Sequence, residues 1–319
     1  MKYNKIIIIC AITFFAAFAT HAQQIAVVSP GGVTTTYTDL NRAIFGAEPG
    51  SSLYLSGGGF QISDTSRIRK KLSIFGIGHQ VGNDNADGNT MVGGNFFFEG
   101  GSDGSSLMGI HLTGNVTVGT TANAVHNFLM RFCNVNVVTV ALNINCRGVT
   151  INQNYIRGDF NGGNSPITVS NNIMWNIISI TGGIVEHNVT RNGINATNSQ
   201  VRNNIIFGSI SGANTLFTNN MVVGQTSLPN RLGENCFQSL WADAFDETVF
   251  NVAPTSNYKL KENSVGKGTA SNGTDIGIYG GTGFNDKGLP PIPRIVSKKI
   301  ADQTDDEGKL RVEIEVSVE

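Results

Sequence analysis

The chain has 319 residues, with 22 basic and 23 acidic side chains, a formal net charge of −1 and only 14% charged residues. This balance excludes a basic nucleic-acid-binding protein, a highly charged disordered protein and a long coiled coil. Because 39 glycines accompany so few charges, we expect a turn-rich, mostly β fold.

The first residues have the features of a secretory signal peptide. A basic start is followed by an apolar run over residues 6–19 and by small residues at Thr20 and Ala22. This pattern predicts a signal peptide over residues 1–22, cleaved after Ala22, and a secreted, periplasmic or cell-surface protein. The run is too short to span a bilayer, and no later segment is long and apolar enough to do so, so we expect no membrane span after removal of the signal peptide.

The mature chain keeps three cysteines, Cys133, Cys146 and Cys236. An odd count allows one disulfide at most, so a disulfide scaffold is excluded. We therefore expect a packed core to hold one domain over residues 23–290. The tail, residues 291–319, is too short for an independent domain and contains one predicted strand, where apolar and polar residues alternate over 310–318.

A repeat lies in the middle of the chain, where 23 of the 121 residues between 105 and 225 are asparagine. Five asparagines recur at spacings of 18, 16, 16 and 16 residues: Asn154, Asn172, Asn188, Asn204 and Asn220.

The neighbours of these asparagines repeat in the same phase. Three positions earlier the residue is apolar: Ile151, Val169, Val185, Val201 and Phe217. Two positions earlier it is polar: Asn152, Ser170, Glu186, Arg202 and Thr218. One position later it is apolar again: Tyr155, Ile173, Val189, Ile205 and Met221. This alternation indicates short strands, with both apolar columns directed inward and the polar column directed outward.

A turn at every sixteenth to eighteenth residue, always in one phase, predicts a solenoid whose coils stack roughly 4.8 Å apart. Asparagine suits the corner because it tolerates left-handed backbone and because stacked amides can form a hydrogen-bonded ladder. Met130, Arg131 and Cys133 fit the same template one coil earlier, with Cys133 at the ladder position. Leu53–Leu55, Leu72–Phe75, Phe96–Phe98 and Leu107–Ile110 are predicted to form earlier coils.

Over roughly residues 25–285, the sequence resembles the pectin-lyase-like family of right-handed parallel β-helix proteins. The resemblance rests on Tyr37-Thr-Asp-Leu-Asn-Arg-Ala-Ile44, on residues 101–110 and on the exit segments at 275–281 and 289–293. It implies an all-β solenoid with an N-terminal capping helix near residues 38–46 and an irregular C-terminal cap. It also implies extracellular polysaccharide lyases or hydrolases as relatives.

The residues needed for that chemistry are scarce. Hydrolysis of glycosides takes two carboxyl groups about 5–9.5 Å apart, but Asp159 and Glu186 are the only acids between residues 105 and 225. The acid cluster of the calcium-dependent lyases and the Gly-His-Gly motif of polygalacturonase-like members are both missing. A metal-free lyase that uses His187 or His126 as its base stays open. We predict no catalytic residue, no metal and no cofactor.

The outward polar column is the best candidate site. Glu186 and Arg202 lie one coil apart and should pair, either as a surface salt bridge or as part of a shallow sugar-binding track with Trp175 or Tyr155 stacking on a ring. Tyr155 has the inward phase, which favours core packing. The candidate binding residues are Arg131, Asn152, Glu186, His187, Arg202 and Trp175.

Two further motifs favour simpler interpretations. Residues 83–88 match the first half of a calcium loop, but Gly94 replaces the bidentate glutamate, which favours a polar surface loop. The basic cluster at 67–71 fits a solvated edge, or a contact with an anionic glycan.

We therefore expect a secreted β-helix protein that binds a polysaccharide or a cell-surface glycan without catalysis. The alternative is an extracellular polysaccharide lyase or glycoside hydrolase. A third hypothesis is a spacer or adhesin module with no small ligand.

Overall fold

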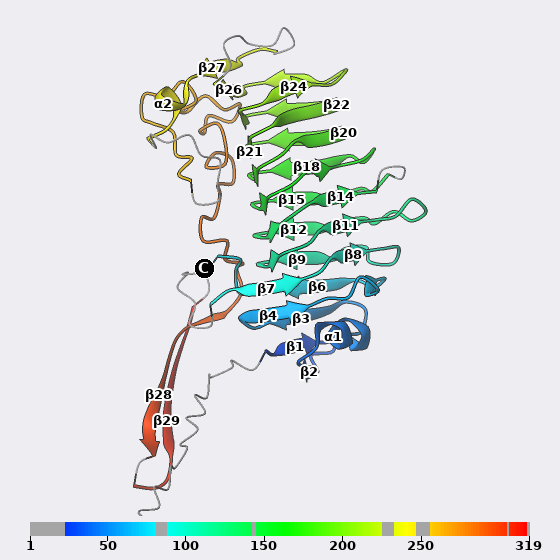
Figure 1. The fold of residues 1–319 in the computed structure, drawn as a ribbon, viewed down its shortest axis with the longest axis vertical. Helices are drawn as coiled ribbons and strands as arrows, with labels where there is room; N and C mark the ends of the chain where they lie inside the picture. Colours follow the sequence, from blue (N-terminus) through cyan, green and yellow to red (C-terminus); the bar gives the residue numbers. More distant parts are fainter. Residues whose placement is uncertain are drawn as a thin grey trace, which may run out of the picture.

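The computed structural model describes residues 23–80, 88–141, 145–224, 233–246, 256–304 and 306–317. The expected signal peptide and most of the calcium-like loop lie outside these residues. The described chain forms a parallel β-solenoid of about 10 turns, with 42% of its residues in strands and 4% in helices (Figure 1). The all-β, parallel β-helix expectation is confirmed.

Each full coil contributes strands to three faces. The first face contains β3 (Ser51–Leu55), β6 (Leu72–Phe75), β9 (Ser106–Met108), β12 (Leu129–Arg131), β15 (Thr150–Asn152), β18 (Ile167–Ser170), β25 (Leu216–Thr218) and the C-terminal parts of β20 (Ile178–Glu186) and β22 (Gly193–Arg202). The second face contains β4 (Gly58–Gln61), β7 (Thr90–Gly93), β10 (His111–Leu112), β13 (Asn134–Val135), β16 (Tyr155–Ile156), β19 (Ile173–Met174), β21 (Val189–Thr190), β23 (Ile205–Ile206), β26 (Met221–Val223) and β27 (Phe237–Ser239). The third face contains β5 (Arg67–Ile68), β8 (Phe96–Phe98), β11 (Val116–Val118), β14 (Val138–Val140), β17 (Phe160–Asn161), β24 (Ser209–Ser211) and the N-terminal parts of β20 and β22.

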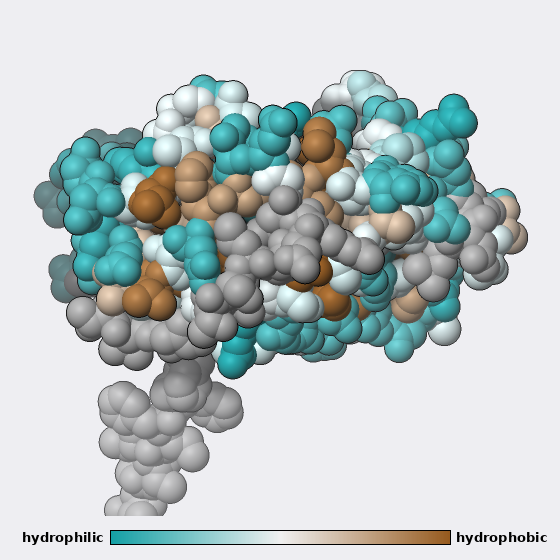
Figure 2. Space-filling model, turned by 90° about the horizontal axis from the view of Figure 1, so that it is seen from above, coloured by the Kyte–Doolittle hydropathy of each residue, from teal (hydrophilic) through white to brown (hydrophobic). Residues whose placement is uncertain are grey.

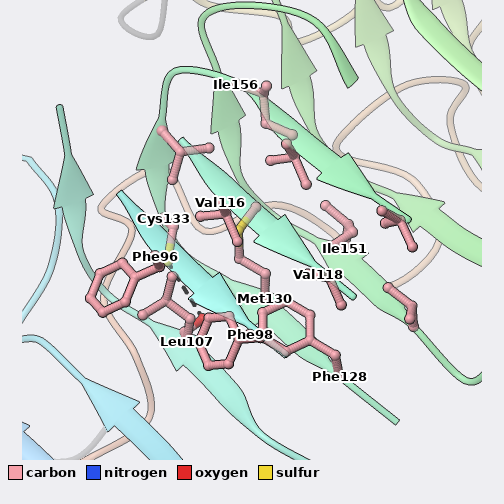
Figure 3. Packing of buried hydrophobic residues seen from close by; sticks show 14 of the residues in the cluster. Phe96, Phe98, Leu107, Val116, Val118, Phe128, Met130, Cys133, Ile151 and Ile156 are labelled. Atoms are coloured by element: carbon pink, nitrogen blue, oxygen red, sulfur yellow. Dashed lines mark hydrogen bonds between the residues drawn. The ribbon is translucent and has the colours of Figure 1, made fainter. Parts of the chain in front are cut away.

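The interior is filled by side chains from all three faces. Phe98 packs 4.6 Å, centroid to centroid, from Phe128, and Met130 and Leu107 lie beside them (Figure 3). Each fully buried apolar side chain of this kind contributes about 1.5–3 kcal/mol relative to an exposed one. The predicted inward column at Ile151, Val169, Val185, Val201 and Phe217 belongs to this core.

The N-terminal end is closed as expected. β1 (Ile25–Val28) pairs antiparallel with β2 (Thr34–Tyr37) and with β3, so the first coil has no open edge there. Helix α1 (Leu40–Gly46) follows, and the Asp39 side chain caps it by accepting a 2.8 Å hydrogen bond from the Arg42 N–H. The predicted capping helix is confirmed.

At the other end, α2 (Trp241–Ala244) and Phe245 pack beside the last coils, with Trp241 and Phe245 rings 4.6 Å apart. Figure 2 views the molecule from this end and shows hydrophobic patches among polar residues. Leu216 and Leu240 are exposed hydrophobic residues of this region. In the described part of the chain, neither helix has the length or apolarity needed to cross a membrane.

The predicted asparagine ladder is present and fully buried. The backbone N–H and the side-chain amide of Asn172 both donate to Asn188 Oδ1, at 2.9 and 3.0 Å. The same pair of hydrogen bonds links each of the other neighbouring asparagines in the column. Cysteines continue the column at both ends: Cys133 N–H donates to Asn154 Oδ1, and the Asn220 amide lies 3.9 Å from Cys236 Sγ. Burial raises the pKa of Cys133 to about 12, which fits a structural thiol.

The left-handed residue of each corner, however, is not the ladder asparagine. It is the residue just before it, and we call these residues the corner column: Phe132, Gln153, Asn171, His187, Asn203, Asn219 and Asn235, with φ between 52° and 60°. The corner therefore separates two tasks. One residue takes the unusual backbone conformation, and the next turns its amide into the ladder.

A second correction concerns the apolar column that follows the ladder. Tyr155, Ile173 and Val189 do not face the interior but belong to a separate hydrophobic cluster on the outside of the second face. The next residue along each strand, such as Ile156 or Met174, faces the interior instead. Tyr155 is thus a core residue, as expected, but of a different core.

Residues 256–292, here called the return segment, cover that second cluster. They run back along the solenoid after the last coil (Figure 1) and contribute Tyr258, Ile276 and Ile278 to the cluster. An apolar outer face of a sheet must be covered, and this segment covers it.

The tail differs from the expectation of one strand. Besides the predicted strand, observed as β29 (Leu310–Ser317), it contains β28 (Arg294–Thr304), and the two form an antiparallel hairpin. The hairpin projects beyond the N-terminal end of the solenoid (Figure 1).

We predict that Asn188→Ala lowers the free energy of unfolding by about 3 kcal/mol or more, because it leaves several buried amide and carbonyl groups without partners. The Asn188 amide donates to Val169 O and Asn204 Oδ1, and its oxygen accepts from Asn172. Urea unfolding measures the loss. The matched control is Asn195→Ala, at an exposed asparagine of the adjoining coil, which should change stability little; equal losses in both variants would contradict a special role for the ladder.

A buried histidine lies beneath the end of the return segment. His79 is 2% exposed, Gly288 packs against its ring, and neither ring nitrogen has a hydrogen-bond partner among the residues described. Burial lowers its pKa from 6.5 to about 4, and the neighbouring His111 adds to the effect. The folded protein therefore holds this ring neutral.

We predict that stability falls as the pH drops from 6.5 towards 4, because the unfolded chain binds a proton there that folded His79 does not. The stability is present in full above pH 6.5, and the loss amounts to about 3 kcal/mol. Urea unfolding at pH 7, 5.5 and 4.5 measures it. His79→Leu should flatten the profile; an unchanged profile in this variant would show that other groups cause it.

Candidate functional site

A groove of about 540 Å³ lies where the outer side of the first face meets the return segment. The first face and its corners supply most of its walls, through Leu129, Arg131, Thr150, Asn152, Ser170, Asn171, Glu186, His187, Arg202 and Asn203. The return segment supplies Ser271, Asn272, Gly281 and Thr282. The groove is therefore formed by two parts of the chain that are distant in sequence.

The predicted outward column forms the floor of this groove. Parallel pairing places Arg131 beside Asn152, Asn152 beside Ser170, Ser170 beside Glu186 and Glu186 beside Arg202. These side chains therefore stand one above another along the solenoid axis, at a spacing of roughly 4.8 Å set by strand pairing. Five of the six candidate binding residues line the groove: Arg131, Asn152, Glu186, His187 and Arg202.

Glu186 and Arg202 form the expected ion pair, with Arg202 Nε 2.8 Å from Glu186 Oε2. Both side chains are partly exposed, so the pair adds at most about 1 kcal/mol to stability. Arg202 also donates to Gln200 Oε1 at 3.3 Å. The pair fixes two planar polar groups side by side in the lining of the groove.

Arg131 lies at the opposite end of the floor and is the site's unpaired cation among the residues described. Its guanidinium stacks 4.4 Å from the ring of Phe132, and its buried Nε has no hydrogen-bond partner in the described structure. Burial lowers the pKa of Arg131, although a guanidinium remains protonated at neutral pH. Because Nε is buried, an acceptor in the groove would have to approach this guanidinium through its terminal nitrogens.

Between these ends the floor is neutral. The Asn152 amide donates to Ser170 Oγ at 2.8 Å, and both residues are largely buried. Among the described residues, Glu186 is the one carboxylate that lines the groove, and it is already paired. The site thus combines amides, hydroxyls and one free cation.

His187 holds the return segment in place. Asn203 Nδ2 donates to His187 Nε2 at 3.2 Å, so Nδ1 carries the proton and donates to Gly277 O, also at 3.2 Å. Burial lowers the pKa of His187, which keeps the ring neutral at pH 7. Gly280 and Gly281 pack directly against the ring, where any side chain would clash. Both nitrogens are therefore occupied by structural hydrogen bonds.

Asn171 and Asn203 join the groove walls to each other. Asn171 Nδ2 donates to Ile278 O and Gly280 O, both at 2.8 Å. Asn203 Oδ1 accepts from Ser271 N–H at 2.9 Å. These corner residues were missed in the sequence, yet a signal existed, because polar residues precede the ladder asparagine in every coil from Gln153 onwards.

Trp175 does not belong to this site. It follows β19 on the second face, is not among the groove-lining residues, and has the Arg191 guanidinium 4.1 Å above its ring. The expected ring stacking by Trp175 or Tyr155 next to the polar column is therefore wrong, because the corner turns both residues onto another face. In the part of the chain that the structure describes, no three His, Cys, Asp or Glu side chains gather as a metal site would require.

Comparisons with known proteins add no relative. No family model, no curated protein and no solved structure matches the chain.

We predict that Asn171→Asp loosens the return segment, because a carboxylate would face the two carbonyl oxygens that the amide now binds. Amide hydrogen exchange over residues 277–283 should become at least about tenfold faster. Asn198→Asp is the matched control, since Asn198 is also left-handed, with φ 50°, but exposed. Unchanged exchange in Asn171→Asp would show that the apolar cluster alone holds the segment.

Proposed function

We propose that this is a secreted protein that binds a polysaccharide chain or a cell-surface glycan in the groove, without catalysis. The observation that carries the proposal is the file of polar side chains running along the groove floor from Arg131 to Arg202. A linear polymer laid along the solenoid axis would meet a new polar group at every coil.

The composition of the groove suits saccharide hydroxyl groups. Asn152, Ser170 and Thr282 offer both donors and acceptors, which is what a hydroxyl requires. Arg131 adds one cation, so the site suits a neutral chain or one with sparse negative charge. The signal peptide predicted over residues 1–22 supports an extracellular partner.

The geometry gives little support to the alternative, a polysaccharide lyase or hydrolase. Hydrolysis takes two carboxyl groups across the bond, and in the part of the chain that the structure describes Glu186 is the one carboxylate lining the groove. A lyase base needs a free nitrogen or oxygen, and both nitrogens of His187 are bonded within the protein. Membership of the pectin-lyase-like family, proposed from the sequence resemblance, is compatible with the parallel β-helix and its capping helix.

The test is binding of the full protein to immobilised neutral and uronate-containing glycans. Arg131→Gln and Glu186→Gln should each weaken binding about tenfold, because each removes a charge-assisted contact. Arg191→Gln is the matched control, since it removes an arginine from the second face beside Trp175.

Wild-type protein should release no unsaturated products or new reducing ends. Turnover that disappears in Glu186→Gln or His187→Gln would overturn the proposal in favour of an enzyme. An affinity loss in Arg191→Gln alone would move the site to the second face, and no binding to any glycan would favour a spacer module.

A further inference from the structure

A second hollow, of about 800 Å³, lies at the N-terminal cap between helix α1 and strand β5. It shares no residue with the groove, so a ligand bound in this hollow is independent of the proposed function. Its volume is in the range of small-molecule sites. The side chains that matter here are Tyr37, Arg42, Phe45, Arg67, Arg69 and Lys70.

Among the residues that the structure describes, the lining contains three arginines and one lysine and no acidic residue. Glu99, just outside, offsets part of this charge: Arg69 Nε lies 2.9 Å and Arg67 Nε 3.6 Å from its carboxylate. Arg42 is exposed and forms no salt bridge with any residue that the structure describes. The hollow therefore keeps an excess of positive charge.

The side chains of two of the cations, Lys70 and Arg67, are held in place by contacts with other parts of the protein. Lys70 Nζ donates to Phe45 O at 2.8 Å and to Ala47 O at 2.6 Å, which ties the segment after strand β5 to the end of helix α1. The Arg67 guanidinium lies 3.8 Å from the centre of the Phe97 ring. Such fixed side chains lose little freedom when a ligand binds.

An apolar surface accompanies the charge. Phe45 is 88% exposed, the largest exposed fraction of any large hydrophobic side chain in the described chain, and Tyr37 lies against Gly46 on the same lining. An aromatic ring as exposed as that of Phe45 does not belong to the hydrophobic core. A ring placed beside arginines provides a flat apolar contact next to charge-assisted donors.

We infer that this hollow binds a sulfated saccharide unit. A sulfate ester offers three terminal oxygens and stays ionised, so it can accept hydrogen bonds from several guanidinium groups at once, whereas a carboxylate offers two oxygens in one plane. The apolar face of the sugar ring would pack on Phe45. For the basic cluster at residues 67–71 the sequence left open a solvated edge or a contact with an anionic glycan, and the hollow favours the second, because helix α1 adds Arg42 and Phe45.

The experiment measures binding of the full protein to dextran sulfate, with neutral dextran as the matched polymer. Arg42→Gln/Arg69→Gln should lower the affinity for dextran sulfate at least about tenfold, and Phe45→Ser about fivefold. The three side chains are exposed, and losing the Arg69–Glu99 ion pair costs at most about 1 kcal/mol, so the melting temperature should fall by no more than a few degrees. The groove variant Arg131→Gln should bind dextran sulfate like the wild type.

The matched control is Lys309→Gln/Arg311→Gln in the tail hairpin, which removes the same two charges from exposed positions. It should bind within about twofold of the wild type at about 0.15 M salt, because distant exposed charges are screened. A loss equal to that of Arg42→Gln/Arg69→Gln would reduce the effect to net charge and overturn the site. So would no binding of dextran sulfate, or binding of neutral dextran that Arg42→Gln/Arg69→Gln weakens by the same factor. Binding of polygalacturonate that is as tight as that of dextran sulfate, and equally weakened by Arg42→Gln/Arg69→Gln, would overturn the assignment to sulfate.

Discussion

Five asparagine amides buried in one column hold the coils of this solenoid in register. The first four amides donate to backbone and side-chain oxygens, and Asn220 donates to Val201 O and Cys236 Sγ. Each amide oxygen accepts from the coil before it, as Asn188 does from Asn172. A coil that slipped by one residue would leave these buried groups without partners, at about 1–3 kcal/mol each. Register in turn aligns every other column, so a polar residue at one position of the repeat becomes a continuous polar file on the surface.

The corner that contains the ladder also explains why the second face is covered. The residue before the ladder asparagine takes the left-handed conformation, so its side chain points away from the interior of the solenoid. The apolar residue after the ladder asparagine also lies on the outside. The outside of the second face therefore has a stripe of apolar residues such as Tyr155, next to hydrogen-bonding side chains such as Asn171. The return segment satisfies both, by burying Ile276 and Ile278 and by offering carbonyls to the corner column.

The groove is a consequence of that docking. The first face alone would be an open, shallow polar surface, and Ser271 and Thr282 give it a second wall. Neutral histidines lie beneath the wall, with His187 bonded to Gly277 and His79 packed under Gly288. The binding proposed for the groove and the predicted loss of stability at low pH both depend on the return segment staying in place.

The sequence determined the coil, the ladder and the polar file, because each depends on spacing along a chain whose contacts repeat every sixteen to eighteen residues. It also placed Arg131, Glu186 and Arg202 together, and it predicted the capping helix. Tertiary structure decided what the repeat could not encode. The direction of the turn at each corner places Trp175 and Tyr155 on the second face, away from the polar file on the first face. The spacing of residues in the sequence does not distinguish these two faces. The return segment contacts His187 and Asn171 although it lies about a hundred residues further along the chain. Hydrogen bonds and buried area determine this contact, and the periodicity of the sequence does not predict it.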